Sequence, residues 1–270
     1  MHSVIQAVAA LPLAALLAAP LSAEADPFQI VSASRTVDAS LTSSGFGSQP
    51  PTLLNTDLGA WDASRPLMHS ADLGRGSTGG TVTVSQQSFV GTSRLDFTGS
   101  AEAISHSGFN PPPVPPPFSS TTVQGMTGYA VAFDVVTPVP ISLALDAEAG
   151  GNAATFSFDL LRDGVVVVTE SLRSDPNRAS LTRTFSSILL LQPGHYALSS
   201  VVAVSARSDT VITENAHSVA LGAFTLAAVP EPQSWASLLA GLALVAVLVR
   251  RKSLPPGVCT ARARRVMHAD

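Results

Sequence analysis

The fold is decided by Tyr129-Ala-Val-Ala-Phe-Asp-Val135, a stretch in which every second residue is large and mainly apolar. The same alternation recurs in Ile141-Ser-Leu-Ala-Leu145 and in Thr155-Phe-Ser-Phe-Asp-Leu160. A period of two places one apolar row on a buried face and a more polar row on the opposite face. These three stretches are therefore expected to be half-buried β-strands.

Similar stretches follow, and turn signals separate them. Asp163-Gly164 accepts positive φ in a tight hairpin, and Gln192-Pro193-Gly194 suits a type II turn. Short strands with such turns predict an all-β fold, an antiparallel, jelly-roll-like β-sandwich over residues 26–229. The other strands expected are Thr81–Val84, Val165–Glu170, Leu181–Leu191, His195–Ala206 and His217–Ala227. One face of the strand from His195 is expected to carry Tyr196, Leu198, Ser200, Val202 and Val204.

Two segments are expected to lack strands. Residues 32–60 predict loop or polyproline structure, and Asn110-Pro-Pro-Pro-Val-Pro-Pro-Pro117 predicts a semi-rigid spacer. A ligand for a domain that binds polyproline helices is the alternative for the second segment.

Charge is sparse and unevenly distributed along the 270 residues. Residues 26–229 carry 9 Arg, no Lys and 16 acidic residues, whereas residues 250–270 carry six cations and one acid. An acidic body without a basic stripe argues against nucleic-acid binding, which needs clustered Lys or Arg. The single cysteine, Cys259, excludes an internal disulfide, and no metal or other cofactor is expected.

The first 25 residues have the pattern of a secretory signal peptide. Val4 to Leu21 is almost entirely apolar, and Ala23 and Ala25 are small residues at the spacing that a signal peptidase accepts. The region before Val4 has no Lys or Arg, which is unusual for such a peptide. A buried N-terminal helix is the alternative, and Pro12 and Pro20 argue against it because proline interrupts helices.

A second apolar run, residues 235–249, is followed directly by Arg250-Arg251-Lys252. Fifteen helical residues reach only about 22 Å, which is short of a hydrocarbon core of ~30 Å. Trp235 at one interface and snorkelling cations at the other extend that reach. We expect one transmembrane helix, with the basic end in the cytoplasm and the body exported.

Residues 229–252 resemble the PEP-CTERM sorting signal of Gram-negative bacteria, also labelled the ice-binding protein C-terminal motif. The resemblance rests on three parts in a fixed order: Pro230, Glu231 and Pro232; the apolar run from Trp235; and Arg250, Arg251 and Lys252. It implies that an exosortase, a membrane protease-transferase, reads the signal and that the protein reaches the outer surface or the extracellular polymer matrix. A proline-rich stop before an ordinary anchor helix is the alternative.

The two prolines make physical sense in such a signal. Pro230 and Pro232 hold the segment extended, so that a protease meets strand-like backbone just outside the bilayer. Residues 253–270, which members of that family usually lack, are expected to form a basic cytoplasmic tail or to reflect a shifted reading frame.

Motifs for common chemistries are weak or missing. Gly74-Arg-Gly-Ser-Thr-Gly79 matches the dinucleotide-binding pattern by letter, but a strand rather than a helix is expected after it, which favours a turn. No Walker lysine or G-x-S-x-G elbow occurs. A Ser/His/Asp triad built from distant positions stays open. The histidines of the body have no metal-site spacing: His69, His106, His195 and His217.

Asp146 and Glu148 should face the same side of a strand, and Asn152 follows a glycine turn. Their oxygens suit Ca²⁺, but three ligands are fewer than that ion prefers. A polar strand end that runs into a turn is the favoured interpretation.

The leading functional prediction is a noncatalytic exported surface or matrix protein, processed by an exosortase after passage through the secretion machinery and the inner membrane. The alternative is a carbohydrate-binding or adhesive module of the exopolysaccharide matrix. Its support is thin because only Trp61, Tyr129 and Tyr196 offer Trp or Tyr rings for sugar stacking. Ice binding, which wants flat Thr arrays, and catalysis rank lower.

Overall fold

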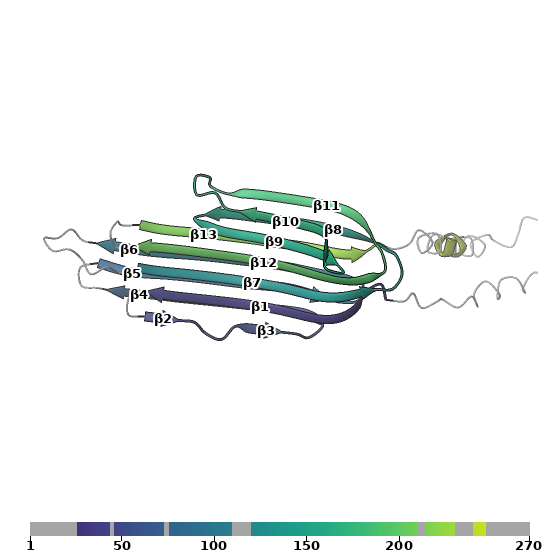
Figure 1. Ribbon diagram of the computed structural model, residues 1–270, viewed down its shortest axis with the longest axis horizontal. Coiled ribbons are helices and arrows are strands. Elements are labelled where there is room, and N and C mark those ends of the chain that lie inside the picture. Colours follow the sequence, from purple (N-terminus) through teal and green to yellow (C-terminus); the bar gives the residue numbers. More distant parts are fainter. Residues whose placement is uncertain are drawn as a thin grey trace, which may run out of the picture. The chain divides into compact units, whose positions relative to one another are not determined.

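The computed structural model describes residues 26–43, 46–72, 76–109, 120–209, 214–229 and 240–246. The chain divides into two units, Met1–Ala228 and Val229–Asp270. All the described strands belong to the first unit, where they form two antiparallel sheets (Figure 1). The prediction of an all-β sandwich is therefore confirmed.

The seven-stranded sheet has two long central strands, β7 (Ser120–Val135) and β12 (Gly194–Asp209). On one side of this pair lie β9 (Ala153–Arg162) and the edge strand β10 (Val165–Arg173). On the other side lies β1 (Gln29–Ser43), which also pairs with the short strands β2 (Phe46–Ser48) and β3 (Leu53–Asn55).

The six-stranded sheet has the order β11-β8-β13-β6-β5-β4. Every neighbouring pair in it is antiparallel. Its strands are β11 (Leu181–Leu191), β8 (Val139–Gly151), β13 (Glu214–Ala228), β6 (Arg94–Phe109), β5 (Gly76–Val90) and β4 (Gly59–Asp72).

The chain crosses repeatedly between the sheets from β6 onward. Strands β6, β8, β11 and β13 lie in one sheet, and β7, β9, β10 and β12 lie in the other. The orders β6-β13-β8-β11 and β7-β12-β9-β10 are those of an eight-stranded jelly roll. Strands β1 to β5 widen this arrangement on one side.

The core lies between the sheets and is built by the alternation that the sequence shows. In β7, Tyr129, Val131, Phe133 and Val135 are all buried, and their neighbours face solvent. An aromatic cluster joins both sheets, because the ring of Phe224 packs against Phe97, Tyr129 and Phe158 at centroid distances of 5.2–5.8 Å. Such ring pairs add to the stability that burial of apolar surface supplies.

Several local expectations are confirmed. Asp163 and Gly164 both have positive φ, 50° and 79°, in the hairpin between β9 and β10. The face predicted for β12 is buried from Tyr196 to Val204, including Ser200, whose Oγ donates to the carbonyl of Ser157.

The prediction that residues 32–60 are loop or polyproline is wrong, because β1, β2 and β3 lie in this range and β4 begins there. The inward row of β1 contains Arg35 and two alanines among its larger apolar side chains, while its outward row is mostly Ser and Thr. This low contrast hides the period of two. Low contrast likewise hides the period of two in β6, for which no strand was expected.

The signal peptide at residues 1–25 and the proline-rich spacer at residues 110–117 lie outside the described residues. Of the transmembrane helix expected at residues 235–249, the structure describes residues 240–246, which are helical. Within the described part of the chain, no helix has the length and apolar character needed to cross a membrane.

Candidate functional site: a polar groove across the six-stranded sheet

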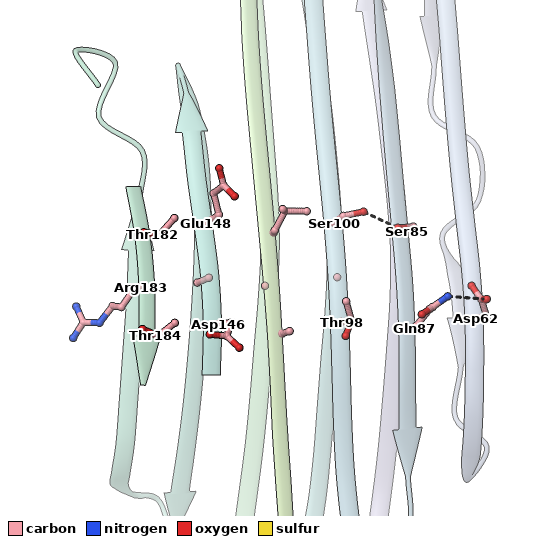
Figure 2. Close-up of a pocket in the computed structure, with 15 residues that line it drawn as sticks. Asp62, Ser85, Gln87, Thr98, Ser100, Asp146, Glu148, Thr182, Arg183 and Thr184 are labelled. Carbon is pink, nitrogen blue, oxygen red and sulfur yellow. Dashed lines mark hydrogen bonds between the residues drawn. The ribbon is translucent and has the colours of Figure 1, made fainter. Parts of the chain in front are cut away.

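The outer face of the six-stranded sheet carries an open groove of about 570 Å³ that all six strands line (Figure 2). Its side chains are mainly hydroxyls, carboxylates and one carboxamide, with Leu221 the largest apolar residue among them. The lining polar residues are Asp62, Ser85, Gln87, Thr98, Ser100, Asp146, Glu148, Thr182, Arg183 and Thr184.

Strand register arranges these residues in two rows that cross the strands. The aspartate row runs from β4 to β11 through Asp62, Gln87, Thr98, Ala223, Asp146 and Thr184. The glutamate row runs beside it from β5 through Ser85, Ser100, Leu221, Glu148 and Thr182. Residues two apart on a strand face the same side, so each strand from β5 to β11 in the sheet contributes one residue to each row, and β4 contributes Asp62 to the aspartate row.

In the half of the groove on β4, β5 and β6, polar side chains form hydrogen bonds with one another. Nε2 of Gln87 donates to Oδ2 of Asp62 at 3.3 Å, and the hydroxyls of Ser85 and Ser100 share a hydrogen bond of 2.6 Å. These contacts orient an amide and two hydroxyls along the sheet (Figure 2).

The half on β8 and β11 differs, because its carboxylates are open. Within the described residues, Asp146 and Glu148 have no hydrogen-bond or ion-pair partner. Arg183 does not neutralise them: its guanidinium points away from the groove and lies 2.7 Å from Glu170 of β10 (Figure 2). Among the described residues that line it, the groove therefore has three carboxylates and no cationic group directed into it.

The floor of the groove rests directly on the core. Gly222 of β13 and Gly99 of β6 face the interior, where the rings of Phe156 and Phe97 occupy the space of a side chain. A Cβ on Gly222 would lie 2.3 Å from Cδ2 of Phe156, which is closer than real contacts allow. Close packing of this kind holds the two rows on a rigid surface.

The structure supports one part of the calcium-site hypothesis but not the rest. Asp146 and Glu148 do face the same side, as expected, but Asn152 is not among the residues that line the groove. In the described ranges, no three His, Cys, Asp or Glu side chains form a group that could hold a metal ion. The two carboxylates are thus better described as part of a long polar surface.

None of the aromatic residues proposed for sugar stacking is exposed. Tyr129 and Tyr196 are fully buried, and Trp61 faces inward beneath the guanidinium of Arg35, 5.6 Å from the ring centroid. An exposed ring lies elsewhere: Phe89 of β5, 39% exposed, shares the outer face with Gln87, two residues away. Considering only Trp and Tyr for sugar stacking misses Phe89, although its spacing of two residues from Gln87 predicts that both face the same side of the strand.

Two histidines lie beside carboxylates at the surface. Nδ1 of His195 is 2.7 Å from Oδ1 of Asp134, and Nε2 of His217 is 3.0 Å from Oε1 of Glu102. These pairs sit on different sheets, and among the described residues no serine hydroxyl bonds either ring. When its imidazole is protonated, each histidine forms a surface ion pair with its carboxylate. This arrangement is not that of a catalytic triad.

The glycine-rich motif is not a nucleotide site. Strand β5 already begins at Gly76, so Gly76 to Gly79 belong to a strand instead of the expected turn, and no helix N-terminus follows them. A cradle for phosphate needs such a terminus.

A second groove, of about 440 Å³, lies on the outer face of the seven-stranded sheet. It contains Asp38 together with the cation Arg173, and small residues such as Ala203 line much of it. Because its charges are balanced, it offers less selectivity than the groove of the six-stranded sheet.

The chain matches no family model and no curated protein. Solved structures show weak likeness: the infectious bursal disease virus VP2 subviral particle has a TM-score of 0.20 at 12% identity, over 76% of this chain and 67% of that one. The GH31 alpha-xylosidase from Xanthomonas citri has a TM-score of 0.17 at 9% identity, over 60% and 32%. Neither likeness is strong enough to assign a fold or a function.

The sorting and cleavage residues predicted from the sequence lie outside the described residues. They are Ala23, Ala25, Pro230, Glu231, Pro232, Trp235, Arg250, Arg251 and Lys252.

Proposed function

We propose that this chain is a noncatalytic exported protein of the cell surface or extracellular matrix, sorted and processed through a PEP-CTERM-like signal at residues 230–252. One observation carries the proposal. The last of the described strands, β13, ends at Ala228, the chain divides into units at the next residue, and Pro230-Glu231-Pro232 follows at once.

The junction suits a detachable signal. Ala228, the last residue of β13, is bound to the sandwich on both sides. It pairs with Ile141, and its N–H donates to the carbonyl of Ser93 at 3.0 Å. Cleavage on the C-terminal side of Val229 breaks none of the pairings between the described strands, so the released body should keep its fold. In this scheme the signal peptide starts export, the helix at residues 235–249 holds the precursor in the inner membrane, and an exosortase removes it.

The test compares the wild-type chain with a Pro230→Ala/Glu231→Ala/Pro232→Ala variant in a host that has an exosortase. Mass spectrometry of surface protein should find a mature wild-type form that begins near Asp26 and lacks residues 235–252, whereas the variant should stay in the membrane with residues 235–252 still attached. Glu102→Ala, which removes one carboxylate from the body, is the control and should be processed normally. Intact Val229 to Lys252 on surface protein would rule processing out.

The groove favours a second candidate function within that destination, a carbohydrate-binding or adhesive module. Its hydroxyl, amide and carboxylate groups match the donors and acceptors of a polysaccharide, and its open form admits a chain. Retention of the exported protein on immobilised polysaccharide tests this function separately from sorting.

A further inference from the structure

We propose that the groove on the six-stranded sheet binds a polysaccharide whose sugars carry protonated amino groups, a polymer of the glucosamine class. The inference rests on the second proposed function and names its ligand. Three features carry it: the distribution of charge in the groove, the hydroxyls between the charges, and an exposed ring beside the groove.

The charge selects against polyanions and for cations. Asp62, Asp146 and Glu148 all line the groove, and carboxylates are ionised at neutral pH. The guanidinium of Arg183, the cationic residue among those that line the groove, pairs with Glu170 instead. An acidic polysaccharide would meet like charge along its length, whereas an ammonium group gains a charge-assisted hydrogen bond at each open carboxylate.

The separation of the carboxylates selects for a polymer. Asp62 lies on β4 and Asp146 on β8, four strands apart in the same row. At ~4.8 Å per strand, this separation is about 19 Å. A single sugar cannot reach both sites, but a chain that crosses the strands contacts both at once and gains from that multivalency.

Hydroxyl side chains fill the space between and beside the carboxylates. Thr98 and Ser100 lie on β6, and Thr182 and Thr184 flank Glu148 and Asp146. Each hydroxyl both donates and accepts, as a sugar hydroxyl does. Phe89, which is 39% exposed, lies two residues from Gln87, the partner of Asp62, on the same outer face, and its ring can pack against the apolar face of a sugar.

A cationic peptide fits this surface less well. Peptides commonly bind a sheet by pairing with a free edge. Between its two ends on the edge strands β4 and β11, the groove crosses β5, β6, β13 and β8, all of which are paired on both sides. A peptide would therefore have no backbone groups to pair with there.

The experiment uses the full chain in detergent and four probes: a glucosamine hexamer, an N-acetylglucosamine hexamer, an alginate hexamer and a lysine hexapeptide. Titration calorimetry at about pH 6 keeps both carboxylates and amines charged. The glucosamine hexamer should bind about tenfold more tightly than its acetylated counterpart. Its affinity should fall as salt is raised, and alginate should not bind.

Two variants locate the site. Asp146→Asn/Glu148→Gln should weaken glucosamine binding about tenfold, because it removes both open carboxylates without changing side-chain size. Asp134→Asn/Asp159→Asn removes the same charge from the outer face of the other sheet and should leave binding unchanged. All four residues lie at the surface, and circular dichroism checks that each variant is folded.

Equal binding of both amino-sugar hexamers, or an unchanged affinity of the Asp146→Asn/Glu148→Gln variant, would overturn the inference while leaving a carbohydrate-binding function in place. Binding of none of the saccharides would overturn both. Tighter binding of the lysine hexapeptide than of the glucosamine hexamer would overturn the inference in favour of a basic peptide. The sorting proposal depends on none of these results.

Discussion

Arg35 shows how one residue can organise a segment that has little apolar surface of its own. It faces the interior from β1 and is fully buried. Its guanidinium donates to the carbonyls of Gly59 and Asp57 and to Oδ1 of Asn55. Burial lowers the pKa of this group, and the nearby Tyr129 and Asp57 act in the opposite direction. The hydrogen bonds tie residues 55–59 to the sandwich.

Arg35→Met should therefore destabilise the protein by about 1–3 kcal/mol, because several carbonyl groups lose their donor. Urea unfolding measures the change, and hydrogen exchange should rise first at residues 53–59. The control is Arg178→Met. Arg178 is 68% exposed and only pairs with Asp175, so its loss should cost less than about 0.5 kcal/mol. Equal effects of the two substitutions would contradict this role for Arg35.

Two buried tyrosines should make the free energy of unfolding decrease at alkaline pH. Burial raises the pKa of Tyr129 well above its usual range, and burial also raises the pKa of Tyr196. An unfolded tyrosine ionises near pH 10, so above that pH the unfolded chain loses protons that the folded chain keeps. Stability should therefore be unaffected by these groups below about pH 10 and should fall as the pH rises further.

Tyr129→Phe should make this alkaline fall shallower, by up to about 1.4 kcal/mol for each pH unit. Urea unfolding at a series of pH values between about 9 and 11.5 measures the slope. The comparison is with the wild type and with Tyr196→Phe, which keeps Tyr129 and should retain its contribution. An unchanged slope in Tyr129→Phe would show that Tyr129 ionises equally easily in both states.

At the scale of the element, glycine positions decide how closely the two sheets approach. Gly222 of β13 faces Phe156 of β9 and Val202 of β12, and no room is left for a side chain. Gly108 of β6 also lies within a strand, but a Cβ there would meet only Oγ of Ser77 at 3.7 Å. The same substitution should therefore have opposite outcomes at the two sites.

Gly222→Ala should cost about 1–3 kcal/mol because the added methyl group overpacks the core. Gly108→Ala is the matched control and should be neutral or stabilising, since alanine restricts the unfolded chain more than glycine does. Thermal and urea unfolding measure both variants. Similar stabilities for the two would mean that Phe156 moves aside at little cost.

The open edge formed by β10 and β11 shows how the sandwich limits uncontrolled association. Val165 and Val166 are more than half exposed on β10, an edge strand that pairs with β9 on one side. A register shift between Val166 and Val168 interrupts the ladder there, and the Arg183–Glu170 ion pair lies between the two edge strands. Bulges and charged residues of this kind discourage edge-to-edge pairing.

At the scale of the whole molecule, the division of the chain after Ala228 predicts that the sandwich does not depend on the C-terminal unit. A chain that ends at Val229 should melt within about 2 °C of the full-length protein, which corresponds to less than roughly 1 kcal/mol for a domain of this size. Differential scanning calorimetry of the two forms measures this. Loss of a cooperative transition in the shortened chain would show that the two units stabilise each other.

The sequence by itself determined the all-β class, several strands with high apolar contrast and the hairpin at Asp163-Gly164, because periodicity and turn chemistry are local properties. Only the tertiary structure decided that residues 29–43 form a strand, that Arg35 is buried and that Phe89 is exposed beside the groove. The rows of the groove join residues as distant as Asp62 and Thr184, and their alignment depends on strand register. Register arises from contacts between strands far apart in the chain, and the residue pattern within a single segment carries no information about those contacts.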